Sequence, residues 1–217
     1  MKAVLFDFDG TLANTLPVCD HAFQSVFKHF DQRELSSEKI RAMFGPSETG
    51  IIQRNLIHFN KEEAIELYYT KYMEAHTHFV EQNQEIQNLL VYLKKKGLKL
   101  GIVTGKARRS LDISLRALQM ENFFDTIITG DDVTKPKPDP EGVLKALTLF
   151  DVLPQEALFI GDSDADIQAG IEAHVLTFGV HWLPTYQPLK FTVTPNSSYN
   201  TISEFIEAIE AGVGYES

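Results

Sequence analysis

From about residue 97 onward the chain alternates short apolar runs with amphipathic segments of helical period, and this alternation constrains the fold most strongly. The apolar runs are nearly continuous, and in the segments between them apolar residues recur every three or four positions. Strands that are apolar on both faces and joined by helices form parallel sheets covered on both sides. The runs lie at residues 98–105, 125–130, 156–161 and 175–180. We therefore predict an α/β fold with a Rossmann-like core, in which helices cover both faces of a parallel sheet.

The first apolar run, residues 3–7, resembles these strands in composition, but the next strand begins only near residue 98. The sequence between them carries helical apolar stripes at residues 16–30 and 60–76. A last helix in this region ends in three lysines and Gly97, and we expect it to return to the sheet. We therefore predict a core domain of residues 1–14 and 83–217. A helical cap domain of residues 15–82 is inserted after the first strand.

Polar residues of specific kinds follow four of the predicted strands. They supply carboxylates, a hydroxyl group and ammonium groups: Asp7, Asp9, Thr104, Lys135, Lys137, Asp162 and Asp166. In open α/β sheets ligands bind beyond the carboxyl ends of the strands, so we expect these side chains to gather at one edge of the sheet.

Asp7 and Asp9 lie only two residues apart at the end of a strand that looks buried. Two neighbouring anions repel each other, and burying them is costly unless a positive group lies between them. Carboxylate oxygens are hard ligands of the kind that Mg²⁺ prefers, and Mg²⁺ can bridge protein carboxylates and a phosphate. A cation, a protonated partner or an arriving substrate could resolve this conflict. Taken with the other carboxylates, the hydroxyl group and the ammonium group at the strand ends, the acidic pair indicates an Mg²⁺ site.

The segments "DFDGT", "VTG", a lysine followed by proline, and "GDSDAD", in this order, resemble the four motifs of the haloacid dehalogenase superfamily of phosphohydrolases. The resemblance covers essentially the whole chain, because the helical insert is similar to the cap that follows the first motif in that superfamily. The segments "DDVTKPKP" and "GDSDADIQAGIEA" are most similar to its phosphoglycolate phosphatase-like group.

The resemblance implies roles for the residues that match the motifs. Asp7 is expected to attack phosphorus and form an aspartyl-phosphate, and Asp9 to protonate the leaving alkoxide and then accept a proton from water. Thr104 and Gly105, together with a lysine, are expected to bind the phosphoryl oxygens as negative charge builds on them.

The resemblance also implies the metal ligands. Asp7 and Asp162 are expected to bind Mg²⁺ with their carboxylates, and Asp9 with its backbone carbonyl group. Asp166 is expected to contact the metal through a water molecule, or to hydrogen-bond the groups that bind it.

Two lysines could be the phosphate-binding lysine. Family members place it a fixed distance before the second acidic motif, and the spacing from Lys137 to Asp162 matches this distance without a gap. Lys135 would need two extra residues, so we predict Lys137 and keep Lys135 as the alternative.

The segment "FGPSETG", between two predicted cap helices, corresponds to a loop that reaches toward the substrate in relatives. Arg41, Ser47 and Glu48 are therefore candidates for substrate contacts. A simple turn between two helices explains the same glycines and proline equally well.

The motifs predict a phosphatase that hydrolyses a small soluble phosphomonoester, with 2-phosphoglycolate as the first candidate. The alternative in the same superfamily is an inorganic pyrophosphatase. A phosphosugar mutase is disfavoured because Cys19 stands where such mutases carry a histidine. A receiver-type signalling domain shares the type of sheet and an Asp/Thr/Lys site, but it has no cap and carries its aspartate on a middle strand.

Composition restricts the partners. The formal net charge of −10 argues against nucleic-acid binding, and no apolar run reaches the length of a membrane span. Cys19 is the single cysteine, which fits a reducing compartment. We therefore expect a cytoplasmic protein, by default a monomer, whose partner is a small phosphorylated metabolite and neither nucleic acid nor membrane.

Overall fold

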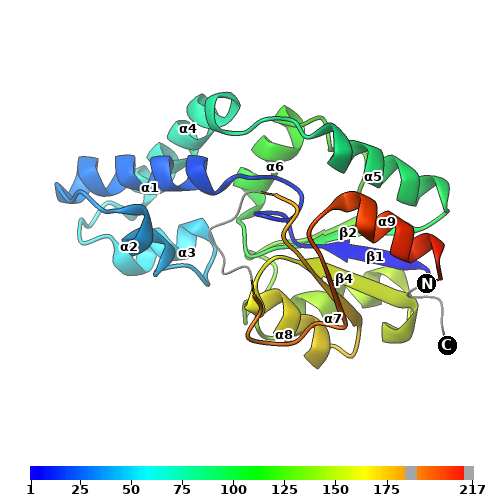
Figure 1. The fold of residues 1–217 in the computed structure, drawn as a ribbon. Helices are drawn as coiled ribbons and strands as arrows, with labels where there is room; N and C mark the ends of the chain where they lie inside the picture. The colour runs from blue at the N-terminus through cyan, green and yellow to red at the C-terminus, as the bar shows by residue number, and fades with distance from the viewer. Residues whose placement is uncertain (184–189, 213–217) are drawn as a thin grey trace.

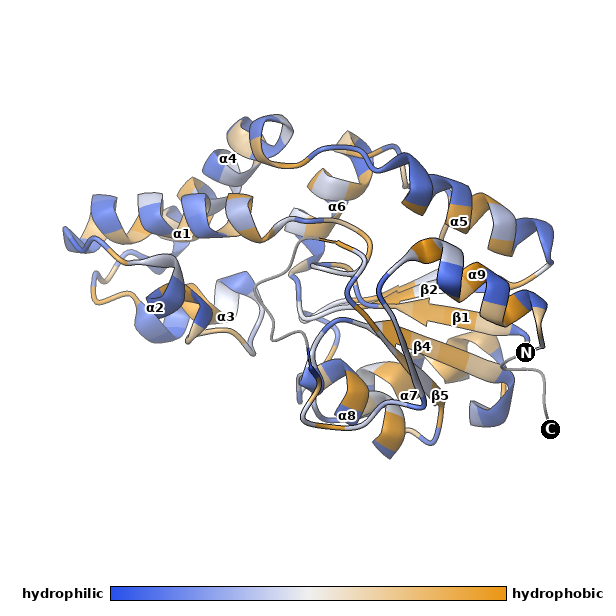
Figure 2. Ribbon diagram, viewed as in Figure 1, coloured by the Kyte–Doolittle hydropathy of each residue, from blue (hydrophilic) through white to orange (hydrophobic). Residues whose placement is uncertain are grey.

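A computed structural model describes residues 1–183 and 190–212. In these residues six parallel strands form one sheet in the order β3-β2-β1-β4-β5-β6. The strands are β1 (Ala3–Phe6), β2 (Lys99–Val103), β3 (Thr126–Ile128), β4 (Ala157–Gly161), β5 (Leu176–Val180) and β6 (Ser197–Tyr199). The parallel α/β sheet expected from the sequence is confirmed. Figure 2 shows that its strands are mostly hydrophobic.

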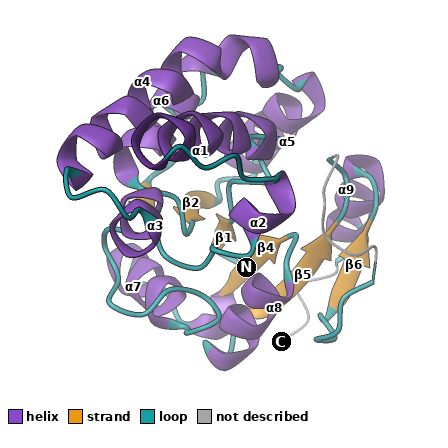
Figure 3. Cartoon of the chain, turned by 90° about the vertical axis from the view of Figure 1, so that its left-hand side faces the viewer, coloured by secondary structure: helices purple, strands orange, loops and turns teal. Residues whose placement is uncertain are grey.

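Helices cover both faces of this sheet. Successive strand residues point to opposite sides, and apolar residues at all four positions of β1 therefore need a buried layer on each face. In β1, Val4 and Phe6 belong to one core, while Ala3 and Leu5 belong to a second core on the other face. The first core is completed by α5 (Gln84–Lys95), α6 (Arg108–Ala117) and α9 (Ile202–Glu210). The second is completed by α7 (Glu141–Phe150) and α8 (Asp164–Glu172), and a short 3-10 helix, Pro154–Glu156, precedes β4. Figure 3 shows the row of strands between these two helical layers.

Four helices inserted after β1 lie beyond the carboxyl ends of the strands (Figure 1). They are α1 (Leu16–Asp31), α2 (Ser37–Arg41), α3 (Glu48–Asn55) and α4 (Lys61–Phe79). Aromatic side chains form much of their core, and the ring centroids of Phe23 and Tyr68 lie 4.6 Å apart. The inserted helical cap is thus present, while its limits at residues 15 and 82 stay a prediction. Within the described residues no helix is both long enough and apolar enough to cross a membrane.

The cap contacts the core through α4 and α6. The hydroxyl group of Tyr72 lies 2.7 Å from Ser114 Oγ, and His76 Nε2 lies 3.0 Å from the same atom. His76 is almost fully buried. Burial, and then the positive charge of Lys106, lower the pKa of His76 to about 4. His76 is therefore neutral in the folded protein at neutral pH.

The low pKa of His76 makes the stability of the fold depend on pH. In the unfolded chain its pKa is about 6.5, so between about pH 6.5 and 4 the unfolded state binds a proton that the folded state does not. The free energy of unfolding should therefore fall as pH drops through this window, by at most about 1.4 kcal/mol per pH unit from this group. Urea unfolding at several pH values measures this slope. His76→Gln should reduce the slope and His78→Gln, in the exposed part of α4, should not; an unchanged slope in His76→Gln contradicts the assignment.

Candidate active site

The candidate site is a cavity of about 470 Å³ between the carboxyl ends of the strands and the cap. Three of its residues directly follow a strand: Asp7 after β1, Thr104 after β2 and Asp162 after β4. Strand order explains why they meet, since β1 lies between β2 and β4 in the sheet. The cap side of the cavity is mostly apolar, with Leu16, Cys19, Phe23, Phe44, Pro46 and Ile51 among its lining residues.

Three buried carboxylates converge on the core side of the cavity. Oxygen atoms of Asp7, Asp162 and Asp166 all lie within 4.8 Å of one another. Two glycines allow this approach. A Cβ on Gly10 would lie 2.3 Å from an oxygen of Asp162, and a Cβ on Gly161 would lie 2.3 Å from Cβ of Asp166. Any larger residue at either glycine would push a carboxylate out of the cluster.

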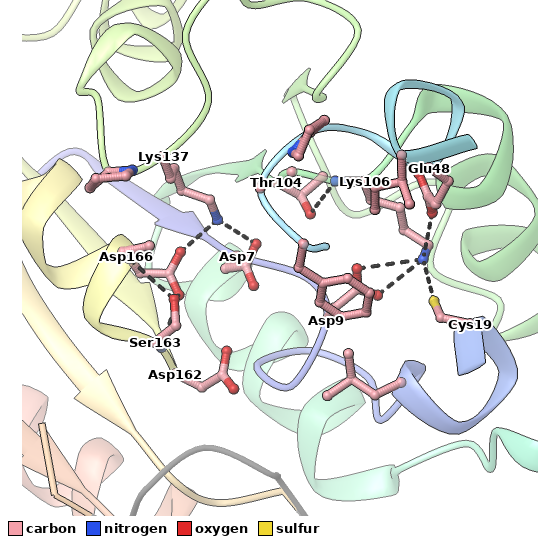
Figure 4. A pocket seen from close by; sticks show the side chains of 18 of the residues that line it. Asp7, Asp9, Cys19, Glu48, Thr104, Lys106, Lys137, Asp162, Ser163 and Asp166 are labelled. Carbon is pink, nitrogen blue, oxygen red and sulfur yellow. Dashed lines mark hydrogen bonds and ion pairs between the residues drawn. The ribbon is translucent and has the colours of Figure 1, made fainter. Parts of the chain in front are cut away.

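Lys137 is the cation of this cluster. Its Nζ lies 2.6 Å from Asp7 Oδ1, 2.6 Å from Asp166 Oδ1 and 3.1 Å from the carbonyl oxygen of Val103 (Figure 4). Burial alone would lower the pKa of Lys137, but the charges of Asp166 and Asp7 raise it above its usual value. The lysine is therefore protonated in the folded protein.

The competing lysine lies elsewhere. The Lys135 side chain is 74% exposed, and its Nζ lies 3.6 Å from Asp139 on the surface. Of the two lysines proposed from the sequence, the structure thus brings only Lys137 to the carboxylates.

Burial raises the pKa of Asp7 to about 7, against the attraction of Lys137 and with further repulsion from Asp166 and Asp9. The protein environment by itself thus disfavours a negative charge on Asp7. The other oxygens of the cluster are partly held in place, since Asp166 Oδ2 accepts hydrogen bonds from Ser163 N at 3.0 Å and Ser163 Oγ at 2.6 Å. This pair forms the capping box of α8 and fixes the Asp166 carboxylate.

Asp9 points away from this cluster. Figure 4 shows its carboxylate directed toward Lys106 and Cys19, on the side opposite to Lys137. Asp9 Oδ1 accepts a hydrogen bond from the hydroxyl group of Thr15 and lies 3.2 Å from Lys106 Nζ. Asp9 therefore lines the part of the cavity that faces the cap, and its carboxylate is not part of the acidic cluster.

Thr104 is buried and lines the cavity next to Gly105. Its hydroxyl oxygen accepts a hydrogen bond from Lys106 N at 3.3 Å. Helix α6 begins at Arg108 with Ala107 as its N-cap residue, so Thr104 is not the cap of that helix. The position of Thr104 is explained by the cavity and not by helix capping.

The three candidates from the cap differ in position. Glu48 lines the cavity and is buried, whereas Arg41 and Ser47 are not among the described residues that line it. Arg41 instead forms an ion pair of 2.7 Å with Asp20 within the cap. Ser47 Oγ lies 2.9 Å from Thr49 Oγ1.

Lys106 was not proposed from the sequence, although it follows the threonine and glycine of "VTGK". Its Nζ lies between Asp9 and Glu48, two carboxylates from distant parts of the chain. From the sequence, a lysine just after a strand would be taken for an exposed charged residue. The one sequence signal for a distant partner is that no acidic residue lies within four residues of Lys106.

Comparison with known proteins identifies the family. Residues 4–180 match the family model described as haloacid dehalogenase-like hydrolase. The chain is 37% identical to pyrophosphatase PpaX of Bacillus mycoides over 183 residues. This alignment covers 84% of this chain and 84% of that protein. The chain belongs to the haloacid dehalogenase-like hydrolase family, and the expected enzyme class, a phosphatase-type hydrolase, is confirmed at that level.

Solved structures share the fold. A predicted phosphoglycolate phosphatase from Haemophilus somnus 129PT has a TM-score of 0.84 at 21% identity, covering 96% of this chain and 98% of that chain. CbbY from Rhodobacter sphaeroides, in complex with phosphate, has a TM-score of 0.83 at 22% identity. The superposition covers 94% of this chain and 96% of that chain. At these identities the likeness supports the arrangement of sheet and cap.

Proposed function

We propose that this protein is an Mg²⁺-dependent phosphatase that hydrolyses a small phosphomonoester, 2-phosphoglycolate first, through an aspartyl-phosphate on Asp7. The observation that carries the proposal is the convergence of Asp7, Asp162 and Asp166 with Lys137 at the base of a capped cavity. Acidic and basic groups gathered at the strand ends suit a reaction in which a phosphoryl group moves between oxygens.

The donor set fits a magnesium ion. The cluster offers carboxylate oxygens only, which are hard ligands, and its shape depends on the missing side chains of Gly10 and Gly161. Asp7 and Asp162 would hold the ion with the backbone carbonyl group of Asp9, and Asp166 would act through water. A bound Mg²⁺ would offset the negative charges of the carboxylates and of the phosphoryl group.

The residues of the cavity suggest how the reaction proceeds. An Asp7 oxygen attacks phosphorus, the bond from phosphorus to the leaving oxygen breaks, and Asp9 gives that oxygen a proton. Thr104, Gly105 and Lys137 hold the three outer phosphoryl oxygens. Water then attacks the phosphorus of the aspartyl-phosphate while Asp9 takes its proton, which releases phosphate and restores Asp7.

The cavity restricts the substrate. Its volume of about 470 Å³ lies in the lower part of the range for small-molecule sites, and the cap side is mostly apolar. Such a cavity suits a small substrate. Arg41, Ser47 and Glu48 stay predictions as substrate contacts, with Glu48 the only one of the three among the described lining residues.

Hydrolysis of inorganic diphosphate is the second candidate. It is favoured by the 37% identity to a relative named as a pyrophosphatase, over most of both chains. Diphosphate is also small enough for the cavity.

Phosphate release from a panel of compounds distinguishes these candidates. The panel contains 2-phosphoglycolate, inorganic diphosphate, nucleoside monophosphates and hexose phosphates, each with Mg²⁺ and with EDTA. We expect one small compound to be turned over with Mg²⁺ and turnover to fall to background with EDTA, because the carboxylate cluster then lacks its cation. Preference for diphosphate would select the second candidate, and undiminished turnover in EDTA would contradict the metal-dependent mechanism.

A further inference from the structure

Lys106 is one of the residues that line the cavity, and its side chain is completely buried. Its Nζ lies 3.2 Å from Asp9 Oδ1, 3.1 Å from Glu48 Oε1 and 3.4 Å from Cys19 Sγ. The ring of Tyr72 covers it, with the centroid 4.7 Å away. A buried ammonium group is stable only when partners replace its lost water, and here protein groups supply all these contacts.

Glu48 connects this lysine to the cap. It is the first residue of α3, and its carboxylate is bound to the core around the start of α6. Glu48 Oε2 accepts a hydrogen bond from Ala107 N at 2.5 Å, and Oε1 accepts one from Ser110 Oγ at 2.6 Å. Because Oε1 also pairs with Lys106, the lysine has its full set of partners only when the cap lies on the core.

Asp9 is held from two sides. The hydroxyl group of Thr15, just before α1, donates to one oxygen, and Lys106 Nζ contacts both oxygens at 3.2 and 3.4 Å. Together they direct the carboxyl group toward the cap side of the cavity, away from the phosphate-binding residues (Figure 4). A leaving group bound below the cap would lie on this side.

We propose that Lys106 is a positioning residue, which holds the Asp9 carboxyl group at the leaving-group side of the cavity and is itself held by Glu48 of the cap. The proposal rests on the acid–base function proposed for Asp9. Lys106 does not bind substrate, because its ammonium group is enclosed by Asp9, Glu48, Cys19 and Tyr72. The consequence is that Asp9 is fully oriented only in the form with the cap on the core.

The test compares two leaving groups in Lys106→Met, which keeps the long apolar stem and removes the ammonium group. An alkyl phosphate such as 2-phosphoglycolate needs a proton on its departing oxygen, whereas 4-nitrophenyl phosphate does not. Since kcat/KM reports formation of the phosphoenzyme, we expect kcat/KM to fall roughly 100-fold for the alkyl phosphate and less than about 10-fold for the aryl phosphate. Lys39→Met, an exposed cap lysine, should change neither value.

Two further variants test the connection through the cap. Glu48→Gln removes the charge that holds Lys106 and should show the same selective loss, smaller in size. The double variant Lys106→Met/Glu48→Gln should lose no more than Lys106→Met alone. It also removes both buried charges together, so it remains a usable test if Lys106→Met alone leaves Glu48 unpaired and does not fold.

Other outcomes would overturn the proposal. Equal losses for both substrates would mean that Lys106 only supports the structure. A raised KM with unchanged kcat, limited to substrates with a second anionic group, would mean that Lys106 binds substrate. Asp7→Asn tests the proposed function separately from the role of Lys106. If Asp7→Asn loses turnover of both the alkyl and the aryl phosphate, the proposed phosphatase mechanism is supported whatever the Lys106 variants show.

Discussion

Asp7→Asn is expected to reduce phosphate release by at least ~10⁴-fold, to the background of the assay. The amide has almost the shape of the carboxylate but lacks a nucleophilic oxygen, so no aspartyl-phosphate can form. Asp7 directly follows β1 and lines the cavity, and its Oδ1 lies 2.6 Å from Lys137 Nζ. Steady-state phosphate release, and acid-quenched labelling with a radioactive substrate, measure the loss of turnover and of the phosphoenzyme.

Asp164→Asn is the matched control for this variant. Asp164 lies in the same "GDSDAD" segment, but its carboxylate accepts hydrogen bonds from Thr192 and Val193 and does not line the cavity. It should retain wild-type turnover. Appreciable phosphoenzyme in Asp7→Asn would mean that another residue is the nucleophile.

Asp7→Asn should also leave the fold intact. Burial raises the pKa of Asp7 to about 7, whereas in the unfolded chain it is about 3.8. Above pH 7 the carboxylate is charged in both states, and its burial lowers the free energy of unfolding of the wild type. In EDTA above pH 7, the variant should therefore be at least as stable as the wild type in urea unfolding. Loss of activity without loss of stability distinguishes a catalytic defect from a folding defect.

The sequence predicted the sheet and the edge at which the site lies. Continuous apolar runs and helical periods are local signals, and the order of motifs along a parallel sheet brings Asp7, Thr104 and Asp162 to neighbouring strand ends. The spacing to Asp162 also favoured Lys137, which is the lysine that the structure brings to Asp7. The apolar runs and helical periods are local to each element, whereas the choice of Lys137 rested on the spacing that family members share.

The contacts between cap and core could not be predicted in the same way. The partners of Lys106 come from residues 9, 19, 48 and 72, which only the docking of the cap brings together. For the same reason the sequence could not separate Glu48, which reaches the cavity, from Arg41 and Ser47, which do not. How a helical insert sits on a sheet depends on shape complementarity between distant segments, and one sequence holds no local signal for it.

Removing the ammonium group of Lys137 should have the second large effect, because it acts on both the transition state and the resting protein. Lys137→Ala is expected to lower kcat/KM by on the order of 10²- to 10³-fold, the usual cost of losing a donor that stabilises developing negative charge. It also leaves Asp7 and Asp166 without their buried cation, so the metal-free protein should lose stability and gain more from added Mg²⁺ than the wild type does. Kinetics and thermal unfolding with and without Mg²⁺ measure the two effects.

Lys135→Ala is the matched control for this prediction. Lys135 lies two residues away in the same segment and carries the same charge, but its side chain is 74% exposed and pairs only weakly with Asp139. Its removal should change neither kcat/KM nor the response of the melting temperature to Mg²⁺. If Lys135→Ala lost activity and Lys137→Ala kept it, the lysine of the site would have to be reassigned. A loss shared equally by both variants would instead show that general positive charge near the cavity, and not a donor placed 2.6 Å from Asp7, is what the reaction requires.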